Sequence, residues 1–507
     1  MKKNKSYIIQ SFVILVMASG FFLFFKSNLP SKIFSESPIK TGNVVIDSLL
    51  LEAFADAQEK VDSLPVVVKD KEQKQLADSL SSDGQVVVVS EETLLSQEDE
   101  STYKGMLYLE PFFAKLYTLE KEKGKQVRIA YYGDSMTDGD LIVQDLRKNF
   151  QDNFGGSGVG FIPINVESAK SRGSVKHRYS SNWRVQSFLN VKRPIRPFGV
   201  SGQVFFVKDT VRETWVSLQA GGIRHMTTLN SPTLYYGSSN NKKGKVQVII
   251  GKDTIVKNLS ANSELNKLQL YGGSLYSLKV QFKSADSIPI YGIDVSSRTG
   301  VQVDNFSSRG NSGLPLSLFR VSLMNRFQNN LGYNLIILHY GTNVLNYGSL
   351  DYRWYTKQMG RVVNHLKTCF PNATILVIST ADKSTKYEME MKTDKAVSPL
   401  VKAQRKYAIE TQSGFFNLYD AMGGSGSMIK WVQETPIRAN KDYTHFNFRG
   451  AQEVANLIYK HLDEGYKAYK LKHGLPAVGE VAEELEKTVG QSEQQKDSTK
   501  VVDTVEK

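Results

Sequence analysis

One serine, one histidine and one aspartate stand out because of the residues around them. Ser135 follows the apolar run RIAYY in RIAYYGDSMTDGD, and a helical pattern, LIVQDLRKNF, comes after it. His445 lies three residues after Asp442 in ANKDYTHFNFRG. On a loop or half-turn, that spacing lets a carboxylate hold the histidine Nδ1–H and leaves Nε2 to take a proton from a serine. These residue types and spacings indicate nucleophilic catalysis by an activated serine.

Two further stretches carry groups that can stabilise an oxyanion. The run NLIILHYGTN ends in Asn343, whose amide can donate a hydrogen bond to developing negative charge. VDNFSSRGNSG contains Gly310 and Gly313, where a backbone N–H can approach the same oxyanion. Each signal is weak alone, because asparagine is common at turns and serine is common as a helix cap.

A parallel sheet is the element that must position these groups. The apolar runs VRIAYY, NLIILHY, TILVIST and GFFNLYD end in turn or polar residues, and helical patterns such as RWYTKQMGRVVNHLKTCF lie between them. Short apolar strands separated by helices indicate a parallel sheet covered on both faces. Ligands bind at the carboxyl ends of such strands. Ser135 is therefore expected there, ahead of a helix whose N-terminus favours negative charge.

A second pattern fills residues 165–300. Strands such as GQVFFVK, TWVSLQA, KVQVIIGKDT and SLKVQFK are broken by Gly, Asn and Ser, which is typical of a β-sandwich or jelly roll. The α/β pattern begins before this region and resumes after it, so the β domain is predicted to be an insert. Its Trp183, Trp215, Tyr235 and Tyr236 are candidates for stacking on sugars, although aromatic residues in strands are more often part of a core.

The N-terminus predicts export. MKKNK precedes YIIQSFVILVMASGFFLFF, which is long enough to cross ~30 Å of hydrocarbon, and the flanking lysines place the rest of the chain outside the cytoplasm. No small-x-small site follows, so we expect an uncleaved inner-membrane anchor with a periplasmic or otherwise extracytoplasmic catalytic part; a cleaved signal sequence is the alternative. The expected divisions are the anchor or signal sequence (1–30), a largely disordered extracytoplasmic linker (31–100), the α/β domain (101–164 and 301–472), the β insert (165–300) and a disordered tail (473–507).

Composition excludes several other classes of protein. The single cysteine, Cys369, rules out an internal disulfide framework and a multi-cysteine metal site. The net charge of +13 raises the question of nucleic acid, but the 64 basic residues are scattered and no zinc-finger or RNA-recognition pattern accompanies them. Asp134, Asp138 and Asp140 are clustered, yet Met136 stands where a calcium loop needs an oxygen ligand. We expect no nucleic-acid partner, no metal and no cofactor.

In this order, the motifs resemble the SGNH (GDSL) family of serine esterases. GDSMTDG matches the first block of the family, RGNSG the second, YGTN the third and DYTH the fifth, over roughly residues 126–462 without the insert. The resemblance implies a flavodoxin-like three-layer sandwich in which Ser135 is the nucleophile, His445 the general base and Asp442 its orienting partner. It also implies an oxyanion hole made of the Ser135 N–H, a glycine N–H and the Asn343 side chain. Gly313 fits the family's G-x-x-G pattern better than Gly310, and both remain candidates.

A narrower resemblance concerns DNFGGSGVGFIPI and the β insert that follows it, which are similar to bacterial peptidoglycan O-acetylesterases. This implies an exported esterase that removes O-acetyl groups from a cell-wall or extracellular glycan, first of all peptidoglycan, through an acyl-enzyme. The implied partners are the acetylated glycan and, through the N-terminal helix, the membrane. Two alternatives stay open: an O-acetyltransferase with the same triad, and a non-catalytic glycan-binding wall protein.

Overall fold

The computed structural model describes residues 47–53, 99–122, 124–208, 212–345 and 350–476, together with Met17 and Ala55. The predicted anchor at residues 7–25, apart from Met17, and the tail beyond residue 476 lie outside this set. In the described part of the chain, no helix has both the length and the apolar character that crossing a membrane requires.

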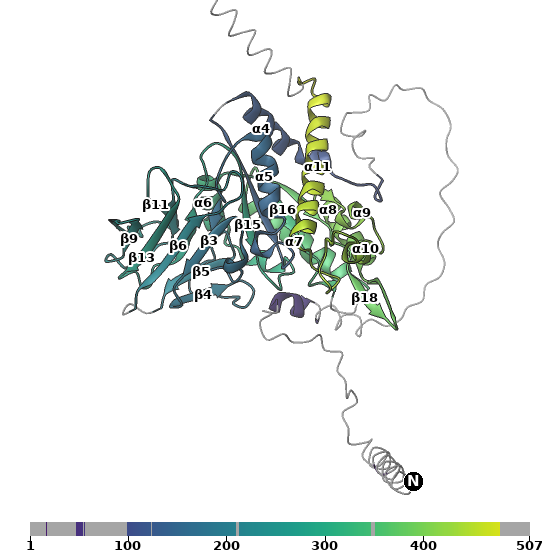
Figure 1. Ribbon diagram of the computed structural model, residues 1–507, viewed down its shortest axis with the longest axis horizontal. Helices are drawn as coiled ribbons and strands as arrows, with labels where there is room; N and C mark the ends of the chain where they lie inside the picture. Colours follow the sequence, from purple (N-terminus) through teal and green to yellow (C-terminus); the bar gives the residue numbers. More distant parts are fainter. Residues whose placement is uncertain are drawn as a thin grey trace, which may run out of the picture. The chain divides into compact units, whose positions relative to one another are not determined.

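A five-stranded parallel sheet forms the centre of the α/β domain (Figure 1). Its strands are β15 (Gly300–Ser307), β1 (Gln126–Gly133), β16 (Tyr333–His339), β17 (Thr374–Ile378) and β20 (Gly414–Phe416), in that spatial order. The chain thus adds β15 on one side of β1 and the later strands on the other, which is the flavodoxin-like order. The fold class predicted from the sequence is confirmed, and the order of the strands reverses beside the carboxyl end of β1.

Helices cover both faces of this sheet because its strands are apolar on both sides. Ile129 and Tyr131 of β1 point into one core cluster, while Ala130 and Tyr132 point into the other. The first cluster includes side chains of α4 (Glu110–Lys121), α5 (Val143–Phe154), α9 (Leu418–Ala421), α10 (Ser427–Gln433) and α11 (Phe448–Lys472). The second includes α6 (Val321–Leu331), α7 (Arg353–Cys369) and α8 (Val397–Glu410). Short 3-10 helices, η2 (Met106–Leu109), η3 (Asp138–Asp140), η4 (Ala169–Ser171) and η5 (Leu314–Leu318), and the hairpin of β18 (Ser384–Tyr387) and β19 (Glu390–Thr393) complete the α/β part and its junction with the insert.

The insert consists of two antiparallel sheets packed on a shared apolar core, as a β-sandwich requires. One sheet has the order β10-β9-β13-β6-β3 and the other β11-β8-β14-β5-β4, with β2 paired to β14. The strands are β2 (Phe161–Ile162), β3 (Val175–Tyr179), β4 (Trp183–Ser187), β5 (Gln203–Val207), β6 (Thr214–Ala220), β8 (Thr233–Tyr236), β9 (Lys245–Ile250), β10 (Asp253–Asn258), β11 (Asn266–Gln269), β13 (Ser277–Lys283) and β14 (Ile290–Asp294), and β7 (Leu229–Asn230) pairs with β12 (Ser274–Leu275). Because β2 already belongs to this sheet, the insert begins slightly before the predicted boundary at residue 165.

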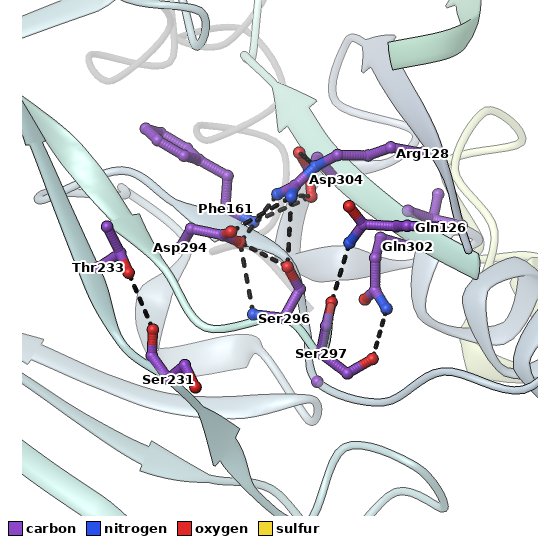
Figure 2. Close-up of polar contacts among 12 residues, drawn as sticks. Gln126, Arg128, Phe161, Ser231, Thr233, Asp294, Ser296, Ser297, Gln302 and Asp304 are labelled. Carbon is purple, nitrogen blue, oxygen red and sulfur yellow. Dashed lines mark hydrogen bonds and ion pairs between the residues drawn. The ribbon is translucent and has the colours of Figure 1, made fainter. Parts of the chain in front are cut away.

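A buried arginine fastens the insert to the central sheet. Arg128 of β1 is 2% exposed and binds Asp304 of β15 through Nε (2.8 Å) and Nη2 (3.0 Å). Its Nη2 also lies 2.8 Å from Asp294, where β14 leaves the insert (Figure 2). Asp304 in addition accepts the N–H of Phe161, the first residue of β2. The chain enters the insert near Phe161 and leaves it near Asp294, and both segments bind the same ionic cluster. The buried guanidinium group is paired with carboxylates, as a buried charge requires.

Residues 48–53 are helical, although they lie inside the stretch predicted to be a linker. Leu50 is 1% exposed and belongs to the same core cluster as Ala130. Glu52 forms an ion pair with Lys192 of the insert. This part of the predicted linker is packed structure rather than a tether.

Candidate active site

Ser135 lies on a tight turn at the carboxyl end of β1, as the sequence predicts. The turn needs Gly133, because a Cβ there would stand 2.2 Å from the Thr137 hydroxyl. After it, the Asp134 carboxylate accepts the N–H of Met136 at 2.9 Å and braces the turn. The strand β1 lies between β15 and β16, and the chain continues on both of its sides. The serine therefore lies where the strand order reverses.

The helix after the serine starts later than the sequence suggested. The helix α5 begins at Val143, and Gly139, Asp140 and Ile142 all have positive φ, between 64° and 69°. Such residues interrupt a right-handed helix, so the N-terminus of α5 does not lie at Ser135. The expectation that this helix dipole acts at the serine is wrong.

The structure brings Ser135, His445 and Asp442 together in one chain of hydrogen bonds. Ser135 Oγ lies 2.9 Å from His445 Nε2, and His445 Nδ1 lies 2.8 Å from Asp442 Oδ2. The other carboxylate oxygen of Asp442 accepts the backbone N–H groups of Thr444 (3.0 Å) and His445 (2.9 Å). A serine, a base and an orienting carboxylate are thus arranged for proton transfer from the hydroxyl.

The electrostatics of Asp442 suit the orienting role. Partial burial alone would raise its pKa, but the hydrogen bonds from the His445 ring and from the backbone N–H groups of His445 and Thr444 outweigh that effect and lower the pKa to about 2. The carboxylate is therefore ionised throughout the range in which an esterase works, and it holds the proton on Nδ1.

The two candidate glycines differ in what their N–H groups do. The Gly313 N–H donates to the side-chain oxygen of Asn311 at 2.9 Å, so it is already engaged. Gly310 is buried with φ of 79°, and the hydrogen bonds described for this part of the chain include none from its N–H. The motif spacing favoured Gly313, whereas the geometry favours Gly310 as the oxyanion glycine.

Asn343 stands between the serine turn and the glycine loop. Its Nδ2 donates to the Asn311 carbonyl oxygen at 3.0 Å and lies 3.4 Å from Asp134 Oδ2. The second distance is long for a hydrogen bond. One amide hydrogen therefore fixes the side chain, and the other is weakly held and free to turn to a ligand.

Asp134 itself is the most perturbed carboxyl group of the site. It is 1% exposed, and burial raises its pKa to about 6, although the Met136 N–H, the charge of His445 and Thr342 act in the opposite direction. Near neutral pH the group is ionised at a cost in folding free energy, which is common where a carboxylate serves a site.

The acidic cluster after the serine pairs with arginines. Asp138 binds Arg309, and Asp140 binds Arg147 at 2.9 Å and Arg172 at 3.4 Å. Within the described residues, no group of three or more His, Cys, Asp or Glu side chains is placed to hold a metal ion. These aspartates act in the structure as partners of buried or half-buried guanidinium groups.

The aromatic residues proposed to stack on sugars are mostly core residues. Trp183, Tyr235 and Tyr236 are 6%, 4% and 3% exposed, and Trp183 packs edge-on against Phe282. Trp183 and Tyr236 lie in the core of the insert, whereas Tyr235 packs against Phe161 and against Phe327 of α6. All three are buried, so the stacking prediction is wrong for them. Trp215 is half-buried, with Lys279 Nζ 5.0 Å from its ring centre.

Comparison with solved structures supports the fold. A structure described as a peptidoglycan O-acetylesterase in action aligns with a TM-score of 0.58 and 23% identity, covering 73% of this chain and 98% of the other. A family two carbohydrate esterase from Cellvibrio japonicus also aligns (11% identity, 58% and 98% covered), but its TM-score of 0.24 is too low for a structural conclusion. No protein-family model and no curated protein sequence matches the chain. The predicted resemblance to an O-acetylesterase with a β insert is confirmed at the level of the fold.

Proposed function

We propose that this chain is a serine esterase that removes O-acetyl groups from a glycan, in the first place peptidoglycan. The observation that carries the proposal is the continuous chain from Ser135 Oγ through the His445 ring to Asp442, at 2.9 and 2.8 Å. Two motifs that resemble those of the SGNH esterases, GDSMTDG and DYTH, contain these residues, and the shared fold with a peptidoglycan O-acetylesterase supports the choice of substrate.

The acylation half of the reaction follows from the geometry. His445 Nε2, neutral, takes the proton of Ser135 Oγ as that oxygen attacks the acetyl carbonyl carbon. The carbonyl oxygen becomes an oxyanion, which the Asn343 amide and the N–H groups of Ser135 and Gly310 stabilise. The tetrahedral intermediate collapses, the sugar oxygen leaves with the proton from His445, and an acetyl group remains on Ser135.

Deacylation repeats the same steps with water. His445 takes a proton from water, the hydroxide oxygen attacks the acetyl carbonyl, and acetate leaves as His445 returns the proton to Ser135. The His445 and Asp442 side chains are 38% and 49% exposed. Water therefore reaches the base directly, which supports hydrolysis over transfer of the acetyl group to a second sugar.

The proposal also places the enzyme on the outer face of a bacterial inner membrane. It is supported by the apolar run at residues 7–25 and by the lysines before it. Fractionation should recover the full chain with membranes, and external protease should digest the catalytic part in spheroplasts. A chain found only in the cytoplasmic fraction would contradict this localisation.

The test of the reaction uses the purified full-length chain with p-nitrophenyl acetate and with O-acetylated peptidoglycan. We expect p-nitrophenol release from the first and acetate release from the second, both abolished in Ser135→Ala. Transfer of acetyl to added chitooligosaccharide in excess of acetate release would favour the transferase instead. Binding of glycan without turnover of either ester would favour a non-catalytic wall protein.

A further inference from the structure

A cleft of about 130 Å³ lies where the insert meets the α/β domain, and residues 138–140, which follow the serine turn, form part of its wall. Its walls come from residues 138–140 after the serine, from residues 305–309, which lead into the loop with Gly310, and from the insert. Ser308 of this wall donates its N–H to the carbonyl oxygen of Gly133 at 3.1 Å. The cleft wall therefore contacts the last residue of β1, two positions before Ser135.

Two buried polar atoms on the cleft-lining side chains lack a partner in the described part of the chain. The Ser201 hydroxyl belongs to a residue that is 4% exposed, and the Arg172 Nε to a side chain that is 5% exposed. Burying such groups without a hydrogen bond costs free energy, so native structures rarely leave them unpaired. Two such atoms around one cleft point to a ligand that supplies hydrogen-bonding groups.

The charges of the cleft disfavour an anionic ligand. Arg309 is paired with Asp138 and Arg172 with Asp140, and the carboxylate of Glu167 also lines the cleft, so the walls carry no net positive charge. The rest of the lining includes the hydroxyl groups of Ser187, Ser201 and Ser308 and the amide of Gln203. Hydroxyl and amide groups on the walls of a cleft suit a polyhydroxylated ring, which both donates and accepts hydrogen bonds.

We propose that this cleft is a subsite for an uncharged sugar residue that neighbours the acetylated sugar attacked by Ser135. The proposal rests on the esterase function above and adds the residues that select a glycan over a small ester. The Ser201 hydroxyl and the Arg172 Nε–H bind hydroxyl groups of that sugar. The cleft wall contacts the end of β1 through Ser308, so a bound sugar is held at a fixed position relative to the serine turn.

Ser201→Ala tests the subsite, because it removes an unpaired hydroxyl and little packing. We expect kcat/KM for acetylated glycan to fall about 3- to 10-fold relative to kcat/KM for p-nitrophenyl acetate, the loss of one hydrogen bond. Ser201→Val, which adds bulk, should lower the same ratio further. Ser239→Ala is the matched control: this insert serine is also buried but does not line the cleft.

The outcomes separate the two proposals. An unchanged ratio in both folded Ser201 variants would overturn the subsite while leaving the esterase intact. A wild type that hydrolyses p-nitrophenyl acetate but no acetylated glycan would overturn the glycan substrate and the subsite with it. Calorimetry of non-acetylated glycan oligomers with Ser135→Ala gives a readout without turnover, and Ser201→Ala in that background should bind more weakly.

A separate observation concerns Asp47, which lies 265 positions before its partner Ser312. Asp47 is 1% exposed, and its Oδ2 accepts both the N–H of Ser312, at 3.0 Å, and the Ser312 hydroxyl. Its Oδ1 caps the helix of residues 48–53 through the N–H groups of Leu49 and Leu50. One carboxylate thus joins the N-terminal segment to the loop that carries Gly310.

Ser312 follows Asn311, and the Asn311 carbonyl oxygen is the acceptor that holds Asn343. We infer that Asp47 is a positioning residue for the oxyanion hole, which also rests on the esterase function. Asp47 fixes the backbone between Gly310 and Gly313 through Ser312. The segment around residue 47 therefore supports the active site.

Asp47→Ala should lower kcat for p-nitrophenyl acetate about 10-fold with little change in KM, less than the 10²–10³-fold lost with an oxyanion donor. Asp47→Asn keeps one acceptor oxygen and should recover part of kcat. Glu52→Ala, from the same segment but with an exposed ion pair, is the matched control. A folded Asp47→Asn and Asp47→Ala pair with wild-type kcat would overturn this role; an inactive wild type would overturn the esterase instead.

Discussion

The two halves of the candidate active site are held in different ways. The half with Asp442 and His445 is built within one short turn: the carboxylate binds the ring and two N–H groups no more than three residues away. The half with Gly310 is held by distant residues, because the loop from Ser308 to Gly313 binds Asp47, Gly133, Asn343 and Tyr355.

This difference teaches what each half tolerates. The contacts of Asp442 with His445 are local, so substitutions of these two residues should act mainly through the chemistry of the group removed. The loop from Ser308 to Gly313 is held by several chain segments. A substitution in one of those segments, far from the reacting atoms, should therefore cause part of the loss of activity expected for an oxyanion donor. The predictions below follow this distinction, from the largest expected effect to the smallest.

His445→Ala should lower turnover of an acetyl ester by about 10⁶-fold, because the serine, base and carboxylate act as a unit. The fold should remain, since the side chain is 38% exposed. Steady-state kinetics beside thermal unfolding measures both quantities. His225→Ala, which removes an insert histidine paired with Asp152, should keep full activity; equal losses in the two variants would contradict a specific role for His445.

Asp442→Ala should lose about 10⁴-fold, less than the base itself, because Asp442 orients the ring and does not take the proton. Its low pKa, about 2, means that it stays ionised as pH falls toward that value. A pH–rate profile of the wild type should therefore show no separate loss from Asp442 above about pH 3. An Asp442→Ala protein with wild-type kcat would remove this residue from the mechanism.

Asn343→Ala should lose roughly 10²–10³-fold in kcat, the usual effect of one oxyanion donor. The substitution also removes the hydrogen bond to the Asn311 carbonyl oxygen. It should therefore remove an oxyanion donor and also loosen the loop that carries Gly310. Asn325→Ala is the control, because Asn325 also donates to carbonyl oxygens, at Thr368 and Cys369, but away from the site. Similar kcat values for both variants would sink the oxyanion role.

Asp134→Asn should stabilise the fold at neutral pH, because it removes a buried carboxylate charge. In the folded protein the pKa of Asp134 is about 6, whereas its ordinary value is 3.8. The free energy of unfolding should therefore fall as pH rises between those values, because the unfolded chain loses this proton first. The difference corresponds to about 3 kcal/mol at neutral pH. Urea unfolding should show Asp134→Asn more stable at pH 7 and equal to wild type below pH 4; no gain at pH 7 would show that Asp134 is not strained.

The sequence predicts the local half of the site well and the distant half poorly. Asp442 and His445 were found from their spacing, and Ser135 from its place after an apolar run, because those signals lie within a few residues. The parallel sheet and the insert follow from the alternation of two patterns, whereas the flavodoxin-like order follows only from the resemblance to a family. Asn343 and Gly310 were identified, but the contacts that decide between Gly310 and Gly313 come from Asn311 and are not encoded in spacing.

The missed features share one cause, which is contact between segments far apart in the chain. Asp47 precedes an apolar stretch, SLLLEAF, in the manner of a helix cap, but its surroundings are polar and its partner lies beyond the whole insert. Asp140, which precedes α5 and has a positive φ, pairs with Arg147 and Arg172. Trp183 and Tyr236 are core residues because a second sheet covers them, and Tyr235 is buried against Phe327 of α6.

The most direct test of the central claim is covalent labelling of the serine on the turn. A serine-directed fluorophosphonate, followed by peptide mass spectrometry, should modify wild-type protein at Ser135. The label should be absent in Ser135→Ala and strongly slowed in His445→Ala, because the hydroxyl then lacks its base. Labelling at another serine, or full acetyl-ester hydrolysis by a folded Ser135→Ala protein, would contradict Ser135 as the nucleophile.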